Sequence, residues 1–184
     1  RDLHSFPTRR SSDLCDAGKE GQIALYTGND DNIVVDLLTE FRFASNGVER
    51  RARIVGGLLG QWCVWTRKAV ELHAAVRAAL AQAEASGRAV LGAPGFAGKE
   101  WLTLAQEVTD ANAAVFDAAN GFSGCIPGIH EVLRRQGLLA GTWCLNPEEV
   151  MSHGQAEEID RVCAAYPHLV DDDFVKERIE GWLA

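Results

Sequence analysis

Residues 23–38, which read IALYTGNDDNIVVDLL, constrain the fold more than any other stretch of the chain. Residues 23–26 are almost entirely apolar, which is typical of a strand buried on both faces of a parallel sheet. Residues 27–31 then form a polar break. The apolar residues that follow recur at helical spacing: Ile33, Val34, Leu37 and Leu38. The stretch therefore predicts a strand, a loop and a helix, and the loop lies where α/β barrels carry their chemistry.

A second buried strand is predicted over residues 53–59, which read RIVGGLL. Its paired glycines, Gly56 and Gly57, permit either close approach of a ligand or chain segment, or a tight turn into a helix. Both interpretations remain open from the sequence. Upstream, Asn46-Gly47 is a turn signal, and the charged run at residues 49–53 is most often a solvated surface.

The rest of the chain is predicted to be helical, over residues 62–84, 99–119, 126–137, 152–166 and 171–182. Helix-capping patterns mark several starts. One of Asn29, Asp30 and Asp31 is expected to cap the first helix, and Asp171 the last. The longest apolar stripe recurs at helical spacing: Trp65, Ala69, Leu72, Val76 and Leu80. The fold class is thus α/β, and mostly helical.

Composition narrows the function classes. A formal net charge of -8 argues against nucleic acid and anionic membranes as partners. No apolar run approaches the ~20 residues of a membrane-spanning helix. The five cysteines (15, 63, 125, 144, 163) form no CxxC pair, which indicates free thiols in a reducing compartment and hence a cytoplasmic protein. No metal-ligand spacing and no glycine-rich nucleotide loop occurs, so we expect no metal and no cofactor.

Residues 1–14 have no apolar periodicity, and residues 5–14 (SFPTRRSSDL) resemble the in-frame translation of a common sequencing adapter. We expect residues 1–14 to be non-native and the true start of the protein to be lost. Two strands alone do not make a stable parallel sheet, so an upstream half is expected to be missing. The organisation predicted is an adapter-derived segment at 1–14, two strand–helix units at 15–85, and a helical region at 86–184.

Three short motifs, taken in order, carry a family resemblance. They are LYTGNDD at residues 25–31, RIVGGLLG at 53–60 and CIPGIHEVLRRQGLLAG at 125–141. The chain resembles the C-terminal half of the dihydrodipicolinate synthase and N-acetylneuraminate lyase family, class I aldolases built on a (β/α)8 barrel. The first two motifs are similar to the last two barrel strands, and the third to a helix of the C-terminal extension. Gly128 stands where that helix commonly has Val.

The resemblance implies a Schiff-base lyase that acts on pyruvate or another 2-oxo acid, without a cofactor, as a homo-oligomer. The catalytic Lys and a proton-relaying Tyr of the family would both lie before Cys15, so no catalytic residue is expected in this chain. The resemblance places six residues around the substrate: Thr27, Gly28, Asn29, Asp30, Val55 and Gly56. Asp30 and Asp31 are alternatively helix caps. A second hypothesis is a non-catalytic helical module for binding or assembly.

Overall fold

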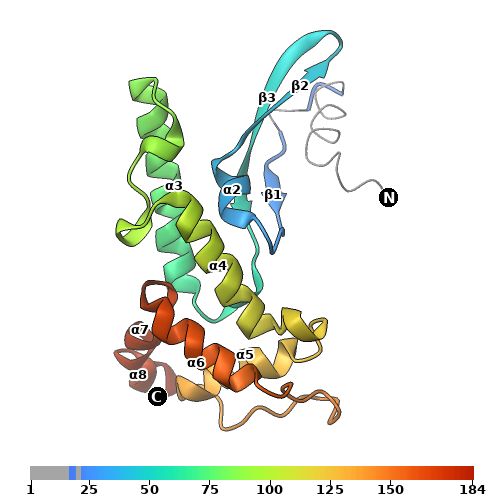
Figure 1. The fold of residues 1–184 in the computed structure, drawn as a ribbon, viewed down its shortest axis with the longest axis vertical. Coiled ribbons are helices and arrows are strands. Elements are labelled where there is room, and N and C mark those ends of the chain that lie inside the picture. Colours follow the sequence, from blue (N-terminus) through green and yellow to red (C-terminus); the bar gives the residue numbers. More distant parts are fainter. Residues whose placement is uncertain (1–16, 20–21) are drawn as a thin grey trace.

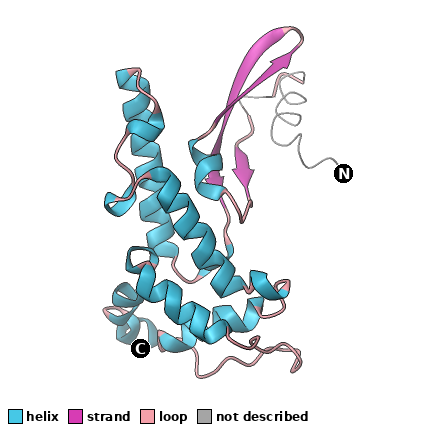
Figure 2. Ribbon diagram, viewed as in Figure 1, coloured by secondary structure: helices cyan, strands magenta, loops and turns pink. Residues whose placement is uncertain are grey.

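A computed structural model describes residues 17–19 and 22–184 of the chain. It is an α/β structure that is mostly helical, with a small mixed sheet, and the described residues close no barrel (Figures 1 and 2). The sheet and a projecting hairpin lie at one end, and the helices of the C-terminal half gather at the other. The segment expected to be adapter-derived lies outside the described residues.

The sheet has three strands in the order β1-β3-β2: β1 is Leu25–Thr27, β2 is Glu40–Ser45 and β3 is Val48–Gly57. β2 pairs antiparallel with residues 48–53 of β3, and β1 pairs parallel with residues 54–57. The register of β1 against β3 shifts between Leu25 and Tyr26. β3 is therefore a strand of two halves, each with its own partner.

The hairpin of β2 and β3 is a correction, because no strand was predicted from the sequence between residues 39 and 52. Its turn does lie at Asn46-Gly47, as the turn signal indicates. Both residues have positive φ, 51° for Asn46 and 75° for Gly47, and an Asn-Gly pair adopts this conformation at little cost. The charged run at residues 49–53 is part of a paired strand as well as a largely exposed surface.

The α-helices are α2 (Ile33–Leu38), α3 (Thr66–Ser86), α4 (Trp101–Phe116), α5 (Cys125–Arg135), α6 (Gln155–Ala165), α7 (Asp172–Lys176) and α8 (Ile179–Leu183). The last predicted helix is thus two short helices. α4 is the central helix, since it packs against α2, α5 and α6 (Figure 1). The predicted stripe of α3 faces the core, with Leu72 and Val76 each 1% exposed.

One apolar core joins the two regions that the sequence divided at residue 86. Trp65 precedes α3 and Trp101 opens α4, and each is only 1% exposed. Ile33 of α2 and Ile159 of α6 belong to the same cluster. No helix in residues 17–19 and 22–184 combines the length and apolar character that crossing a membrane requires.

Two helix starts differ from their predicted caps. The N-cap of α2 is Asn32, and its side chain makes no capping hydrogen bond. Asp171 stands at the N-cap of α7, but its carboxylate accepts the backbone N–H groups of Arg67 (2.7 Å) and Lys68 (3.0 Å) in the first turn of α3. The C-terminal segment therefore caps a helix that begins about 100 residues earlier, a link that local sequence does not reveal.

Candidate functional site

The loop after β1 is held by Asp36, a residue of α2. Thr27 Oγ1 donates a hydrogen bond to Asp36 Oδ2 at 2.8 Å, and Asn29 Nδ2 donates to the same oxygen at 3.2 Å. The backbone N–H of Asn29 also donates to Thr27 Oγ1 at 3.2 Å. Asp36 thus fixes the loop on α2. The sequence analysis did not single it out, although a lone carboxylate among the apolar residues of a short helix needs a polar partner.

A second attachment joins the loop to α4. Thr109 Oγ1 donates to the backbone oxygen of Asp31 at 3.0 Å. Burial, together with the neighbouring charge of Asp31, raises the pKa of Asp30, and a hydrogen bond with Asn112 offsets part of this effect. Asp30 therefore interacts with α4 and does not cap α2. Two helices far apart in sequence hold this loop in one conformation.

The paired glycines at the end of β3 accommodate side chains of the same chain. A Cβ at Gly56 would lie 2.4 Å from the ring of Tyr26, and one at Gly57 would lie 2.8 Å from Ile33 Cδ1. Gly57 faces α2, and Gly56 faces the opposite side, where Tyr26 is 52% exposed. The structure thus shows close approach, one of the two predicted alternatives. The groups that approach Gly56 and Gly57 are the side chains of Tyr26 and Ile33.

A groove of about 580 Å³ lies on the side of the sheet that Tyr26 occupies. His73 of α3 stands at its edge and hydrogen bonds through Nε2 to the carbonyl oxygen of Val55 at 2.9 Å. The residues around the groove are mostly apolar or aromatic, and include Tyr26, Val55, Gly56, Leu58, Trp62 and His73. The groove can therefore take an apolar surface, and its polar groups include the His73 imidazole, the Tyr26 phenol, the Thr66 hydroxyl and the Cys63 thiol.

The six residues expected around a substrate fall into two places. Val55 and Gly56 line the groove. Thr27 and Asn29 hydrogen bond to Asp36 on the α2 side, and the hydroxyl proton of Thr27 is already donated there. Asp30 interacts with Asn112 of α4. Gly28 is exposed, and a Cβ added there would have one neighbour within 4.0 Å, the carbonyl oxygen of Leu58. Of the six residues, only Val55 and Gly56, at the end of β3, line the groove.

The lysines of the described chain lie away from the groove. Lys68 pairs with Glu71 at 3.0 Å and Lys99 with Glu107 at 2.8 Å. Lys19 and Lys176 are exposed, and none of the four lines the groove. Within the described ranges, no three His, Cys, Asp or Glu side chains gather in a way that could hold a metal ion.

Comparison with known proteins gives no relative: no protein-family model, no curated protein and no solved structure matches the chain.

Proposed function

We propose that the chain supplies the last two strand–helix units and the C-terminal helical extension of a (β/α)8 lyase that forms a Schiff base with pyruvate or another 2-oxo acid. The nucleophilic Lys would come from polypeptide before Cys15. The observation that carries the proposal is the parallel pairing of β1 with the second half of β3. It brings the TGNDD loop and the Gly56-Gly57 pair to the same edge of the sheet, the edge at which barrel enzymes bind substrate.

The arrangement of β2 is compatible with this proposal. β2 pairs only with residues 48–53 of β3, so it leaves residues 54–57 to the parallel part of the sheet. Of the described strands, β1 pairs with β3 alone. Parallel sheets are normally covered on both faces and extended at their edges. The second edge of β1 is where the preceding barrel strand would pair.

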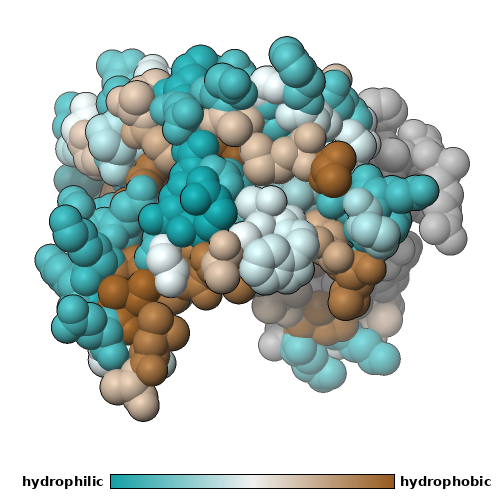
Figure 3. Space-filling model, turned by 90° about the horizontal axis from the view of Figure 1, so that it is seen from below, coloured by the Kyte–Doolittle hydropathy of each residue, from teal (hydrophilic) through white to brown (hydrophobic). Residues whose placement is uncertain are grey.

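The exposed face of the sheet supports the same proposal. α2 covers one face through Ile33, whereas Tyr26 and Val55 are 52% and 54% exposed on or beside the groove. Further large apolar side chains are exposed at the helical end, where brown patches interrupt the hydrophilic surface in Figure 3. They include Ile126, Trp143, Leu145 and Val150. Additional polypeptide over the sheet would remove the first of these surfaces from water.

Borohydride trapping tests the reaction. The protein with its upstream polypeptide is incubated with pyruvate and sodium borohydride, which reduces an imine to a stable secondary amine. We expect mass spectrometry to find one pyruvate-derived group on a single Lys, and only when both reagents are present. A matched variant in which Lys19, Lys68, Lys99 and Lys176 are all replaced by Arg is expected to retain the adduct. Absence of an adduct with every 2-oxo acid tried would rule out the Schiff-base mechanism.

The alternative is a helical binding or assembly module without catalysis. The observation that favours it is the continuous core, in which α4 is buried by α2, α5 and α6 without further polypeptide. Cooperative unfolding of residues 15–184 as a monomer would support this alternative. Poor cooperativity, together with self-association through the sheet edge, would support the lyase.

A further inference from the structure

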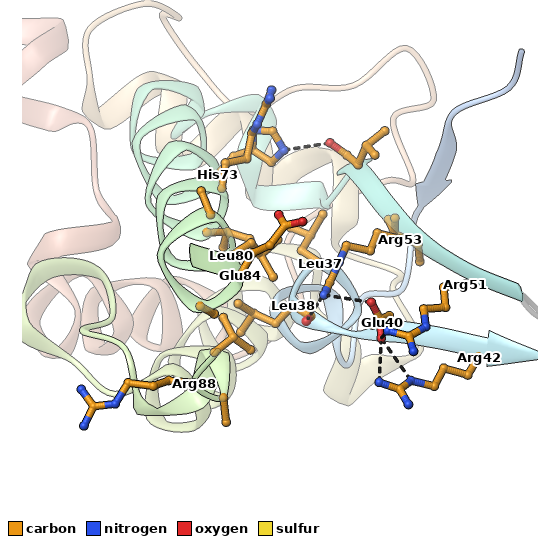
Figure 4. Close-up of a pocket in the computed structure, with 18 of the residues that line it drawn as sticks. Leu37, Leu38, Glu40, Arg42, Arg51, Arg53, His73, Leu80, Glu84 and Arg88 are labelled. Atoms are coloured by element: carbon orange, nitrogen blue, oxygen red, sulfur yellow. Dashed lines mark hydrogen bonds and ion pairs between the residues drawn. The ribbon is translucent and has the colours of Figure 1, made fainter. Parts of the chain in front are cut away.

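A cleft larger than the groove adjoins it along β3, and Val55 and His73 line both. It has a volume of about 840 Å³ and separates the hairpin from α3. Figure 4 shows Arg42, Arg51 and Arg53 gathered around Glu40 on the hairpin side. The charged part of the cleft lies against the half of β3 that pairs with β2, and no residue of the TGNDD loop lines the cleft.

The hairpin wall of the cleft has three arginines, which pair with two carboxylates of the hairpin, Glu40 and Glu49. Arg42 and Arg51 are directly opposite each other in the β2–β3 register, an arrangement that like charges disfavour. Glu40 pairs with both, at 3.0 Å and 3.4 Å. It also lies 3.5 Å from Arg53, and Arg51 has a second partner in Glu49 at 3.4 Å, so three guanidinium groups share two carboxylates on the hairpin. An anion between Arg42 and Arg51 would relieve the repulsion that remains.

The helix wall adds further unneutralised charge. Arg77 of α3 and Arg88, two residues beyond the end of α3, line the cleft and form no ion pair with any residue in the described ranges, and the other charge here is Glu84. Figure 4 shows Arg88 directed away from Arg42 and Arg51. Five Arg and two Glu line the cleft, and when Glu49, which pairs with Arg51 from outside the cleft, is also counted, the excess is two positive charges. The full chain carries -8, so the cleft is a local reversal of sign. Such a reversal attracts anions and raises their local concentration.

The cleft is not only charged. Leu80 and Val90, both partly exposed, line it together with Leu38, which is 5% exposed. Paired arginines recognise phosphate oxygens in a bidentate manner, and apolar walls recognise a hydrocarbon group. We propose that this cleft binds a phosphate monoester that carries an apolar group, with the phosphate between Arg42 and Arg51 and the apolar group against Leu80.

Titration calorimetry with octyl phosphate, below its micelle concentration, tests this site. We expect saturable binding that weakens as salt is added. The double variant R42Q/R51Q is expected to bind at least about tenfold more weakly, because each charged hydrogen bond that is lost costs about this factor. R50Q is the matched control: Arg50 is exposed on the same strand but does not line the cleft, so its affinity is expected to be unchanged.

Further arms separate the two parts of the ligand and guard against a folding defect. Arg77 is on the surface of α3 and has no ion pair in the described part of the chain, so the R77Q variant is expected to fold normally. Its affinity for octyl phosphate is nevertheless expected to be several-fold lower than that of the parent. Octyl trimethylammonium is expected not to bind, and inorganic phosphate to bind more weakly than octyl phosphate. Equal affinity of R42Q/R51Q and R50Q, or equal binding of the ammonium compound, would overturn the proposal.

One last arm identifies the source of the phosphate. The protein is sedimented with phosphatidylcholine vesicles that contain phosphatidic acid. Binding of the parent but not of R42Q/R51Q to these vesicles would assign the cleft to a lipid headgroup. Binding of octyl phosphate without vesicle binding would assign it to a soluble monoester. Either result supports the site. Neither depends on the lyase reaction, so failure of the trapping experiment and failure of this one are separate results.

Discussion

Replacement of Glu131 by Gln is expected to lower the free energy of unfolding by about 2 kcal/mol at pH 7. Glu131 lies on α5 with its side chain 8% exposed. Its carboxylate accepts hydrogen bonds from Arg134 Nε at 2.7 Å and Arg135 Nε at 2.8 Å, and Arg135 continues to Asp160 of α6 at 2.6 Å. The substitution thus removes the negative charge that holds Arg135 in place for its contact with α6. Urea unfolding followed by tryptophan fluorescence measures the effect.

The pH dependence of stability isolates the same group. The Arg134 guanidinium, with a contribution from Arg135, lowers the pKa of Glu131 from 4.5 to about 2. A depressed carboxylate pKa adds stability that is present above pH 4.5 and is lost as the pH falls toward 2. We expect this loss to be absent in E131Q and retained in E157Q, a substitution at an exposed Glu of α6. Identical pH profiles of E131Q and the parent would contradict this account of the α5–α6 contact.

Replacement of Gly128 by Val, the residue common at this place in the family that the chain resembles, is expected to destabilise the protein by about 3 kcal/mol or more. A Cβ at Gly128 would lie 2.1 Å from the backbone oxygen of Val115 and 2.4 Å from Gln155 Nε2. The nearest atom is backbone, so α5 and α4 would have to separate. The helices approach closely here because position 128 has no side chain.

G128A is the milder test, and G181A is its control. Gly181 lies in α8 with nothing within 4 Å of a Cβ, so alanine there is expected to be neutral or slightly stabilising. Thermal unfolding of the two variants should differ by several degrees. Equal melting temperatures would mean that α5 packs less closely on α4 than the structure has it.

Local patterns predicted the parts of the fold that local residues determine. β1, its polar loop and α2 were predicted because apolar spacing changes within residues 23–38. The Asn46-Gly47 turn was predicted, but β2 was not, since its stability comes from pairing with β3, which one segment's periodicity does not show. Asp171 was placed at the start of a helix, whereas its carboxylate caps α3 about 100 residues away. That bond depends on tertiary packing.

The candidate site was less predictable than the fold. Val55 and Gly56 line the groove, and their contact with a substrate stays a prediction. Thr27 and Asn29 were expected beside a substrate, and each donates a hydrogen bond to Asp36 of α2, a partner that the apolar spacing of residues 23–38 does not indicate. Nothing in the sequence around His73 indicates its bond to Val55, which follows only from how α3 packs on the sheet.

The measurement that tests the central claim most directly is the coding sequence of the source locus upstream of the codon for Cys15. A barrel of this kind has about 250 residues, so roughly 150 to 200 further codons are expected in frame. The proposal predicts six more strand–helix units, with a Lys at the end of the strand that precedes β1 and a Tyr at the end of the strand before that. A start codon immediately upstream of Cys15, with no such units, would contradict it.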